Sequence, residues 1–564
     1  MSMPIYAKNK LVKMNSVSSD NWLEQTNKPT HFYSTKVFMP PLDKTLDSRS
    51  FEVELEIKPI IGSELFRVLK DKYNVSSNRR FKTRELPEIR VGLIRYGENI
   101  IPSLRGVQST QHPYWDWQIS PGKIWWEKNT TNITIVLPFS LQEKNANCTH
   151  NGLMLLRFNK DNKKVQGFFQ IGSETCSYYQ FNLASPLKIK ITSTKVANDD
   201  QLVQDYILEK KNKLHTYSRQ NLKTDFPKLN VVNLMPPYIE GSTMSGVVIK
   251  NKHYQLNCQT RFGKYPFCDQ LALPSYSTAK SIFAGIGTMR MEHIYPGIRK
   301  VLVNKVIPQC QSRKWNNVIL DDLINMRSGN YLSRTPHKDE ASKQMYQFFI
   351  SLTDHEKTNL ACNMFPHKAP PGKTMVYHTS DTYLAGVMLN RLLKKITNNS
   401  DKDSYQDLFV NDLWRKLKLS PLLNNTRRTY DDVKQPFTGW GLTYHIDDII
   451  KISHFLEHQL SATDGAIVLD RKMLKSALQV GENRINRDGA EAGIAYNNGF
   501  WALEVSRALH CKKPKWIPFM SGFGGITVAL VSKDILYYNF SDNNKFLWLK
   551  AIKELNRQFP ICEE

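Results

Sequence analysis

The sequence predicts an α+β protein, in which a β-rich first part precedes one sheet flanked by helices. Residues 31–196 contain short apolar runs separated by turn residues, which is typical of closely spaced strands. From residue 226 onward, strands come first, helical patterns fill the middle, and strands return at about 496–541. Strands that return after a helical stretch indicate one sheet covered by helices.

The elements are expected in the following order. Residues 1–30 are predicted to be irregular. Residues 31–196, with segments such as SFEVELEIKPI and NITIVLPF, are predicted to form a sandwich or barrel whose role the sequence does not assign. Residues 197–225 predict a charged helix or linker, and we place the domain boundary there. Residues 226–564 then form the second domain.

Four tryptophans lie close together in the β-rich part. Large aromatic side chains bury more apolar surface than other residues, so we expect this group to pack in the core rather than to form a ligand platform. The group consists of Trp115, Trp117, Trp125 and Trp126.

The chain is strongly basic, with a formal net charge of +25 from 77 Lys and Arg against 52 Asp and Glu. Such an excess makes a polyanionic surface or an acidic wall polymer a candidate partner. The basic residues are dispersed, and no zinc-finger, RNP-like or helix-turn-helix pattern is present, so no nucleic-acid role is predicted. No run of eighteen apolar residues occurs, so no transmembrane segment is expected.

The eight cysteines include no C-x-x-C pair, which argues against a zinc or redox site, and we expect no cofactor. Cys258 and Cys268 flank a predicted hairpin that a disulfide would close, and Cys148 and Cys176 bracket a predicted strand pair. Two such bridges favour a secreted or periplasmic location. The first residues, MSMPIYAKNKLVKMNS, lack the apolar core of a signal peptide, so the compartment stays open.

A serine and a lysine stand three residues apart at the predicted start of a helix. In LPSYSTAKSIFAGIG (273–287), apolar residues at helical spacing follow Lys280, so Ser277 falls in the first turn and Lys280 on the same face one turn on. Burial can lower the pKa of a lysine enough for it to take the proton of a serine hydroxyl. The alternative is a helix-capping serine beside a lysine that extends to solvent.

Two later segments place polar or flexible groups in loops. In APPGKTMVYHTSDTYLAG (369–386), Tyr377 lies between a Pro-Gly turn and a helix predicted to start near Asp381, where a phenol can exchange protons with a lysine. In WIPFMSGFGGITVALV (516–531), a glycine-rich turn precedes an apolar strand and would allow a backbone to approach a ligand. Taken singly, the tyrosine is explained by a structural role and the turn by a hairpin bend.

In this order, the segments resemble the serine β-lactamase and penicillin-binding-protein superfamily, particularly its class C β-lactamase-like and esterase branch. The Ser-x-x-Lys box reads Ser277-Thr278-Ala279-Lys280. The Tyr-x-Asn box looks like Tyr377-His378-Thr379, and the Lys-Thr-Gly box aligns with Met520-Ser521-Gly522. The linking segments VILDDLINMRSGN (318–330) and GWGLTYHIDDIIKISHFL (439–456) are also similar to the family. The resemblance covers about 230–545 and implies a β-lactamase-like fold there, with an antiparallel sheet flanked by helices and a helical subdomain.

The resemblance also implies a serine hydrolase of the esterase or amidase type that works through an acyl-enzyme. Ser277 would be the acylated nucleophile, Lys280 would help to deprotonate it, and Tyr377 would act first as general base and then as acid. The oxyanion hole would use the backbone N–H groups of Ser277 and of the residue after the third box. The expected substrate and oxyanion positions are Thr379, Ser521, Gly522 and Phe523.

Two positions depart from the family pattern. Thr379 replaces an asparagine, and Met520 replaces the cation that meets a substrate carboxylate and keeps the tyrosine deprotonated. A thioether does neither, so we expect a neutral ester or amide substrate, either small or peptide-like, in place of a β-lactam. The alternative function is a catalytically weak or inactive protein that binds a partner. A true β-lactamase or penicillin-binding protein is a third and less favoured interpretation.

Overall fold

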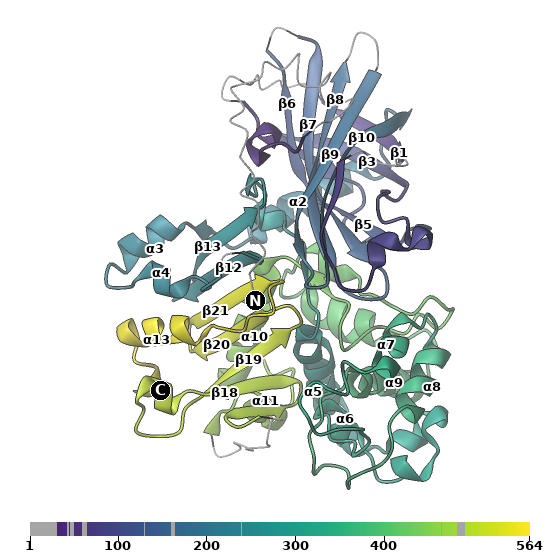
Figure 1. Ribbon diagram of the computed structural model, residues 1–564, viewed down its shortest axis with the longest axis vertical. Coiled ribbons are helices and arrows are strands. Elements are labelled where there is room, and N and C mark those ends of the chain that lie inside the picture. The colour runs from purple at the N-terminus through teal and green to yellow at the C-terminus, as the bar shows by residue number, and fades with distance from the viewer. Residues whose placement is uncertain are drawn as a thin grey trace, which may run out of the picture.

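The computed structural model describes residues 31–563, apart from 42–43, 45–49, 59–64, 129, 160–163, 239, 464 and 482–490. The prediction for residues 1–30 lies outside the described residues. Figure 1 shows the β-rich part at the top, a second sheet at the lower left and most helices at the lower right. No helix in the described part of the chain is long and apolar enough to cross a membrane.

The β-rich part is a barrel. Its ten-stranded sheet has the order β1-β3-β4-β6-β7-β8-β9-β10-β2, with β5 beside β7, and β1 also pairs with β10, which closes the sheet. Of the two predicted architectures, the structure therefore shows the barrel. The strands are β1 (Glu52–Lys58), β2 (Leu65–Asp71), β3 (Ile89–Tyr96), β4 (Asn99–Pro102), β5 (Trp115–Ile119), β6 (Gly122–Trp126), β7 (Asn132–Glu143), β8 (Thr149–Asn159), β9 (Lys164–Thr175) and β10 (Tyr179–Ser193).

The four tryptophans of this part are all buried, as predicted. Trp115, Trp117 and Trp126 belong to the core of the barrel, and the indole N–H groups of the first two donate to backbone carbonyls. Trp125 follows Ile124 on β6, and because strand side chains alternate, it faces the opposite way and packs into the core shared with the rest of the molecule.

The charged segment 197–225 is mostly helical. Helix α2 (Asp199–Asn212) has Tyr206 as its buried residue, and α3 (Arg219–Asp225) follows after the short strand β11 (Thr216–Tyr217). This strand pairs in parallel with β13, so the end of the predicted linker is built into the second sheet.

The second sheet has nine strands in the order β11-β13-β12-β21-β20-β19-β18-β17, with β14 beside β13. Apart from β11, its pairs are antiparallel, as predicted. Strand β12 pairs with β21, which is the last of these strands along the chain. The further strands are β12 (Ser242–Ile249), β13 (Lys252–Thr260), β14 (Gly263–Lys264), β17 (Ile494–Asn497), β18 (Phe500–Glu504), β19 (Trp516–Gly522), β20 (Ile526–Ser532) and β21 (Ile535–Ser541).

Helices cover both faces of the second sheet. Val247 of β12 packs on one face with α3, α4 and α13, whereas its neighbour Val248 packs on the other face in the core that contains α5, α9 and α10. The remaining helices are α4 (Val231–Leu234), α5 (Ile286–Ile294), α6 (Leu320–Ile324), α7 (Lys343–Ile350), α8 (Asp354–Asn363), α9 (Thr379–Ile396), α10 (Ile446–Ser461), α11 (Arg471–Ala477), α12 (Ser506–Leu509) and α13 (Leu549–Gln558).

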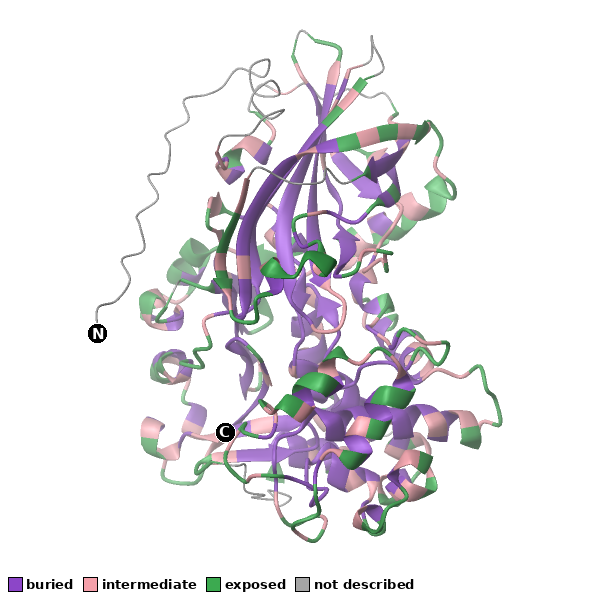
Figure 2. Cartoon of the chain, turned by 45° about the vertical axis from the view of Figure 1, so that its right-hand side comes forward, coloured by how far each residue is buried: buried purple, intermediate pink, exposed green. Residues whose placement is uncertain are grey.

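The core continues from the barrel into the helical part. Val136, Leu153 and Phe168 of the barrel belong to the same apolar cluster as α5 and α9. Figure 2 shows buried residues both along the barrel strands and in the segments below them. The barrel therefore rests on the second part through packed apolar side chains.

All eight cysteines are disulfide-bonded. The bridges Cys148–Cys176 and Cys258–Cys268 confirm the two that the sequence predicts. Cys310–Cys362 and Cys511–Cys562 join residues 52 and 51 positions apart, for which no local pattern gives a signal.

Candidate active site

Ser277 lies in a turn between strand β15 (Leu273–Pro274) and the helix that carries Lys280. The residue before it, Tyr276, has φ of 40°, which is left-handed and unusual for a side chain of this size. The helix is not regular at Lys280, because residues Lys280–Gly285 form a π-helix before α5 begins. Single π-turns inside helices are frequent at functional sites.

The Lys280 ammonium group is at the centre of the site. Its Nζ lies 2.9 Å from Ser277 Oγ, 2.8 Å from Thr379 Oγ1 and 3.1 Å from the carbonyl oxygen of Gly439. The residue is 1% exposed. Burial lowers the pKa of Lys280 to about 8, against the opposing effect of the negative charge of Glu340. A substantial fraction of this amine is therefore neutral near pH 8.

Tyr377 and Thr379 reach the lysine from the start of α9. This helix begins at Thr379, two residues before the predicted start near Asp381. Lys280 Nζ lies 5.1 Å from the centre of the Tyr377 ring, which also stacks on Trp501 at 5.7 Å. Burial and the charge of Glu340 hold the pKa of Tyr377 well above its usual range. The tyrosine is therefore a neutral phenol, suited to donate a hydrogen bond.

Glu340 completes the cluster, and the sequence analysis missed it. Its carboxylate accepts hydrogen bonds from the backbone N–H of Thr379, at 2.8 Å, and from the Thr379 hydroxyl. An acidic group is favoured at the N-terminus of a helix such as α9. Because Glu340 lies 39 residues before Thr379 in the chain, no local spacing in the sequence signals this contact.

The third box runs beside the turn of Ser277. A Cβ atom on Gly522 would lie 2.9 Å from the carbonyl oxygen of Ser275, so only a glycine allows β19 to come this close. The Phe523 ring lies 5.8 Å from that of Tyr276. The structure thus brings Gly522 and Phe523 next to the residues that precede Ser277.

The backbone N–H groups of the two predicted oxyanion donors are free within the described structure. Within the described part of the chain, neither the backbone N–H of Ser277 nor that of Phe523 donates a hydrogen bond. Met520 is fully buried in the core, and Ser521, which is partly exposed, makes no hydrogen bond to Ser277, Lys280 or Tyr377 among the described contacts. Ser521 is therefore the predicted site residue with the least support from the contacts.

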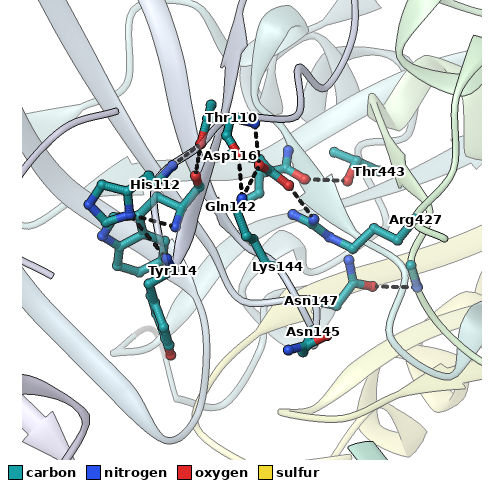
Figure 3. A network of polar contacts seen from close by, with 12 residues as sticks. Thr110, His112, Tyr114, Asp116, Gln142, Lys144, Asn145, Asn147, Arg427 and Thr443 are labelled. Atoms are coloured by element: carbon teal, nitrogen blue, oxygen red, sulfur yellow. Dashed lines mark hydrogen bonds and ion pairs between the residues drawn. The ribbon is translucent and has the colours of Figure 1, made fainter. Parts of the chain in front are cut away.

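A residue of the barrel forms hydrogen bonds with the turn that contains Ser277. Asn147 lies in the loop between β7 and β8, and its Oδ1 accepts hydrogen bonds from the backbone N–H of Tyr276 at 2.7 Å and from Ser275 Oγ at 3.0 Å. The same oxygen accepts the N–H of Gly441 at 3.2 Å. Figure 3 shows Asn147 in a polar network, below Arg427 and above Asn145. Sequence reasoning found no catalytic signal in the barrel and missed this residue.

The same network contains a buried ion pair between the barrel and the segment near Gly439. Arg427 Nη1 lies 2.7 Å from Asp116 Oδ2, and both side chains are almost fully buried. Thr443 Oγ1 donates to Gln142 Oε1 at 2.7 Å, as Figure 3 also shows. The segment whose carbonyl contacts Lys280 is therefore held against β5 and β7.

One group of side chains in the described chain has metal-ligand character. Cys148, His150 and Cys176 lie within 4.8 Å of one another and are buried. The two sulfurs form a disulfide, so neither is a thiolate that binds a metal ion.

Comparisons with known proteins give similar structures only, because no protein-family model and no curated protein matches the chain. EstCE1, described as a hydrolase with promiscuous acyltransferase activity, is 14% identical over 62% of this chain and 100% of its own, with a TM-score of 0.41. A β-lactamase/D-alanine carboxypeptidase from Pseudomonas syringae is 12% identical over 64% and 99%, with a TM-score of 0.38.

A class C β-lactamase variant is 13% identical over 64% of this chain and 99% of its own, with a TM-score of 0.39. The chain resembles these solved structures over 62–64% of its length. This similarity concerns the fold, and the roles of individual residues rest on the contacts described above.

Proposed function

We propose that the protein is a serine hydrolase of the esterase or amidase type that forms an acyl-enzyme on Ser277. The observation that carries this proposal is the position of Lys280, whose buried Nζ contacts both the Ser277 and the Thr379 hydroxyls. A neutral amine has one lone pair and two N–H groups. It can therefore accept the Ser277 proton while it donates to Thr379 and to the Gly439 carbonyl.

Lys280 is the base in this scheme. As Ser277 Oγ attacks the carbonyl carbon of the substrate, its proton moves to Lys280 Nζ and the carbonyl π electrons move to the oxygen. The free N–H groups of Ser277 and Phe523 are suited to stabilise the resulting oxyanion. The leaving group departs with the proton from Lys280, and water then hydrolyses the acyl-enzyme by the reverse sequence of proton transfers.

Tyr377 is assigned the role of hydrogen-bond donor to the leaving group. The resemblance implies a base and then an acid, but the raised pKa of this phenol leaves it protonated at neutral pH. The lowered pKa of Lys280, about 8, makes the lysine the better base. This assignment agrees with the loss of the family cation at Met520, because the buried thioether carries no charge that would lower the pKa of the phenol.

Glu340 stabilises the protonated lysine through Thr379. Lys280 donates to the Thr379 hydroxyl, and that hydroxyl donates to Glu340, so the three groups form one chain of hydrogen bonds. When Lys280 gains the serine proton, the carboxylate at the far end offsets part of the cost of a buried positive charge. Thr379 thereby links a carboxylate to the lysine where the family has an asparagine.

A reactive-serine probe tests the proposal. Incubation with a fluorophosphonate is expected to add one label to the wild-type protein by intact mass and none to Ser277→Ala. Absence of labelling in the folded wild-type protein would contradict the proposal and favour the alternative, a binding protein without activity. Labelling by a fluorescent penicillin would instead indicate a β-lactam-reactive protein.

A further inference from the structure

Five aromatic side chains form a continuous series that begins beside the nucleophile. The ring centres are 5.8 Å apart for Tyr276 and Phe523, 6.2 Å for Phe523 and Tyr178, 5.5 Å for Tyr178 and Tyr73, and 6.4 Å for Tyr73 and Tyr346. We call these residues the aromatic belt. Spacings of this size are those of interacting aromatic pairs.

The aromatic belt joins three parts of the molecule across the Ser277 site. Phe523 lies in the turn after β19, Tyr178 and Tyr73 lie in loops of the barrel, and Tyr346 lies on α7. Figure 1 shows the barrel above the junction between the second sheet and the helices that include α7 and α9. The belt therefore runs from the residue before the nucleophile, across two loops of the barrel, to α7.

Three rings of the belt are open to solvent, and the other two are buried. Tyr73 is 50% exposed, Tyr346 53% and Phe523 44%. Tyr178 is buried, and its hydroxyl donates to Glu143, which also accepts the Tyr114 hydroxyl. Exposed rings on a fixed base next to a reactive centre are a preformed apolar surface, which is typical of ligand recognition.

We propose that the aromatic belt binds the acyl group of the substrate, and that this group is apolar, either aromatic or a medium-length alkyl chain. This inference rests on the proposed function. The inner end of the belt consists of Tyr276, which precedes the nucleophile, and Phe523, whose N–H is a candidate oxyanion donor. An acyl chain that leaves the carbonyl carbon on this side meets the belt first.

The charges around the belt agree with a neutral acyl group. One cation at the belt is Lys72, whose Nζ lies 5.2 Å from the Tyr73 ring centre at the outer end. At the inner end, the third-box position that carries a cation in the family is the buried Met520. A carboxylate on the acyl chain would therefore lack the partner that the third box supplies in the family.

The test compares esters and variants. In wild-type protein, p-nitrophenyl octanoate and p-nitrophenyl phenylacetate are expected to give kcat/KM values well above that of the acetate. Tyr73→Ala and Tyr346→Ala are expected to lower the octanoate-to-acetate ratio about five- to tenfold, which corresponds to the loss of one aromatic contact. Tyr73→Phe is expected to keep the ratio. Tyr238→Ala, which removes an equally exposed tyrosine elsewhere, is the matched control.

A binding measurement separates this inference from the proposed function. In a Ser277→Ala background, calorimetric titration with N-methyl-4-phenylbutanamide is expected to show binding that weakens about tenfold when Tyr73→Ala is added. N-methylacetamide is expected to show no such change. If no ester is hydrolysed but this difference is found, the belt binds apolar groups and the hydrolase proposal fails. Equal affinities or unchanged ester ratios in the Tyr73 and Tyr346 variants would overturn the inference.

Discussion

At the scale of single residues, the lowered pKa of Lys280 should govern the pH dependence of activity. The lysine must be neutral to accept the Ser277 proton, and burial lowers its pKa to about 8. We therefore expect kcat/KM for a neutral ester to rise with pH along a limb centred near 8. Initial rates between pH 6 and 10 test this prediction, and a profile that is flat across this range would contradict it.

Glu340 should control the position of that limb. Its negative charge raises the pKa of Lys280, so Glu340→Gln is expected to move the limb to lower pH. The maximal rate is expected to fall roughly tenfold, because the Thr379 hydroxyl loses a charged acceptor. Asp432→Asn, at an exposed carboxylate, is the control. A lower rate without a shift of the limb would assign Glu340 a purely structural role.

The same pKa predicts a stability effect of known sign. The folded-state pKa of Lys280, about 8, is below the ordinary value of 10.5, so the unfolded chain binds this proton more tightly. The free energy of unfolding therefore increases as the pH rises from about 8 to 10.5. Below that window this contribution of Lys280 is absent. Lys280→Met removes this dependence.

We compare the unfolding free energy of Lys280→Met with that of wild type at each pH. This difference is expected to favour the variant by about 3 kcal/mol more at pH 6 than above pH 10. Urea unfolding at the two pH values measures this difference, which does not depend on the hydrogen bonds that the variant loses at both. An equal effect at both pH values would show that the lysine is not titrating as described.

At the scale of elements, the close approach of β19 to the Ser277 turn depends on Gly522. In Gly522→Ala the new Cβ would lie 2.9 Å from the carbonyl oxygen of Ser275, which is backbone and cannot swing aside. We expect kcat/KM to fall at least tenfold, because Phe523 and its N–H move with the strand. Ser532→Ala, at the far end of the same hairpin, should leave ester hydrolysis unchanged, and an active Gly522→Ala would show that the turn tolerates the shift.

Local spacing explains which parts of the site the sequence could predict. Ser277 and Lys280 are three residues apart at a helix start, and Tyr377 and Thr379 flank the start of α9, so their patterns lie within single segments. Glu340 lies 39 residues from its partner Thr379, and Asn147 lies 129 residues from its partner Tyr276. Neither residue belongs to a motif. For the same reason, the closure of the barrel by β1 and β10 was visible only as an alternative to a sandwich.

At the scale of the whole molecule, the barrel and the site are held together by buried polar contacts. The clearest of these is the Arg427–Asp116 pair, in which both side chains are almost fully buried. Asn147, from the same side of the barrel, fixes the backbone of Tyr276 in its left-handed conformation. The role of the barrel that the sequence left unassigned is therefore, in part, to support the Ser277 turn.

Loss of this ion pair should destabilise the protein strongly. Arg427→Met removes the closer of two cations beside the buried Asp116 carboxylate, and Lys144 Nζ remains 3.6 Å away, so we expect a loss of about 1.5–3 kcal/mol. Chemical denaturation measures this loss of unfolding free energy. Lys252→Met, which breaks the exposed pair with Asp225, is expected to cost less than about 1 kcal/mol. Similar costs for the two variants would contradict the assignment of Arg427 to a buried contact.

The order of strands in the second sheet has a consequence for synthesis. Strand β12, made before the Ser277 turn, takes β21 as its neighbour, although almost three hundred residues separate Val247 from its partner Tyr537. Contacts this distant in sequence slow folding. A chain still on the ribosome holds Ser277, Lys280 and Tyr377 but lacks the strand that completes the sheet beneath them. The proposed active site is therefore expected to be incomplete until strand β21 has left the ribosome.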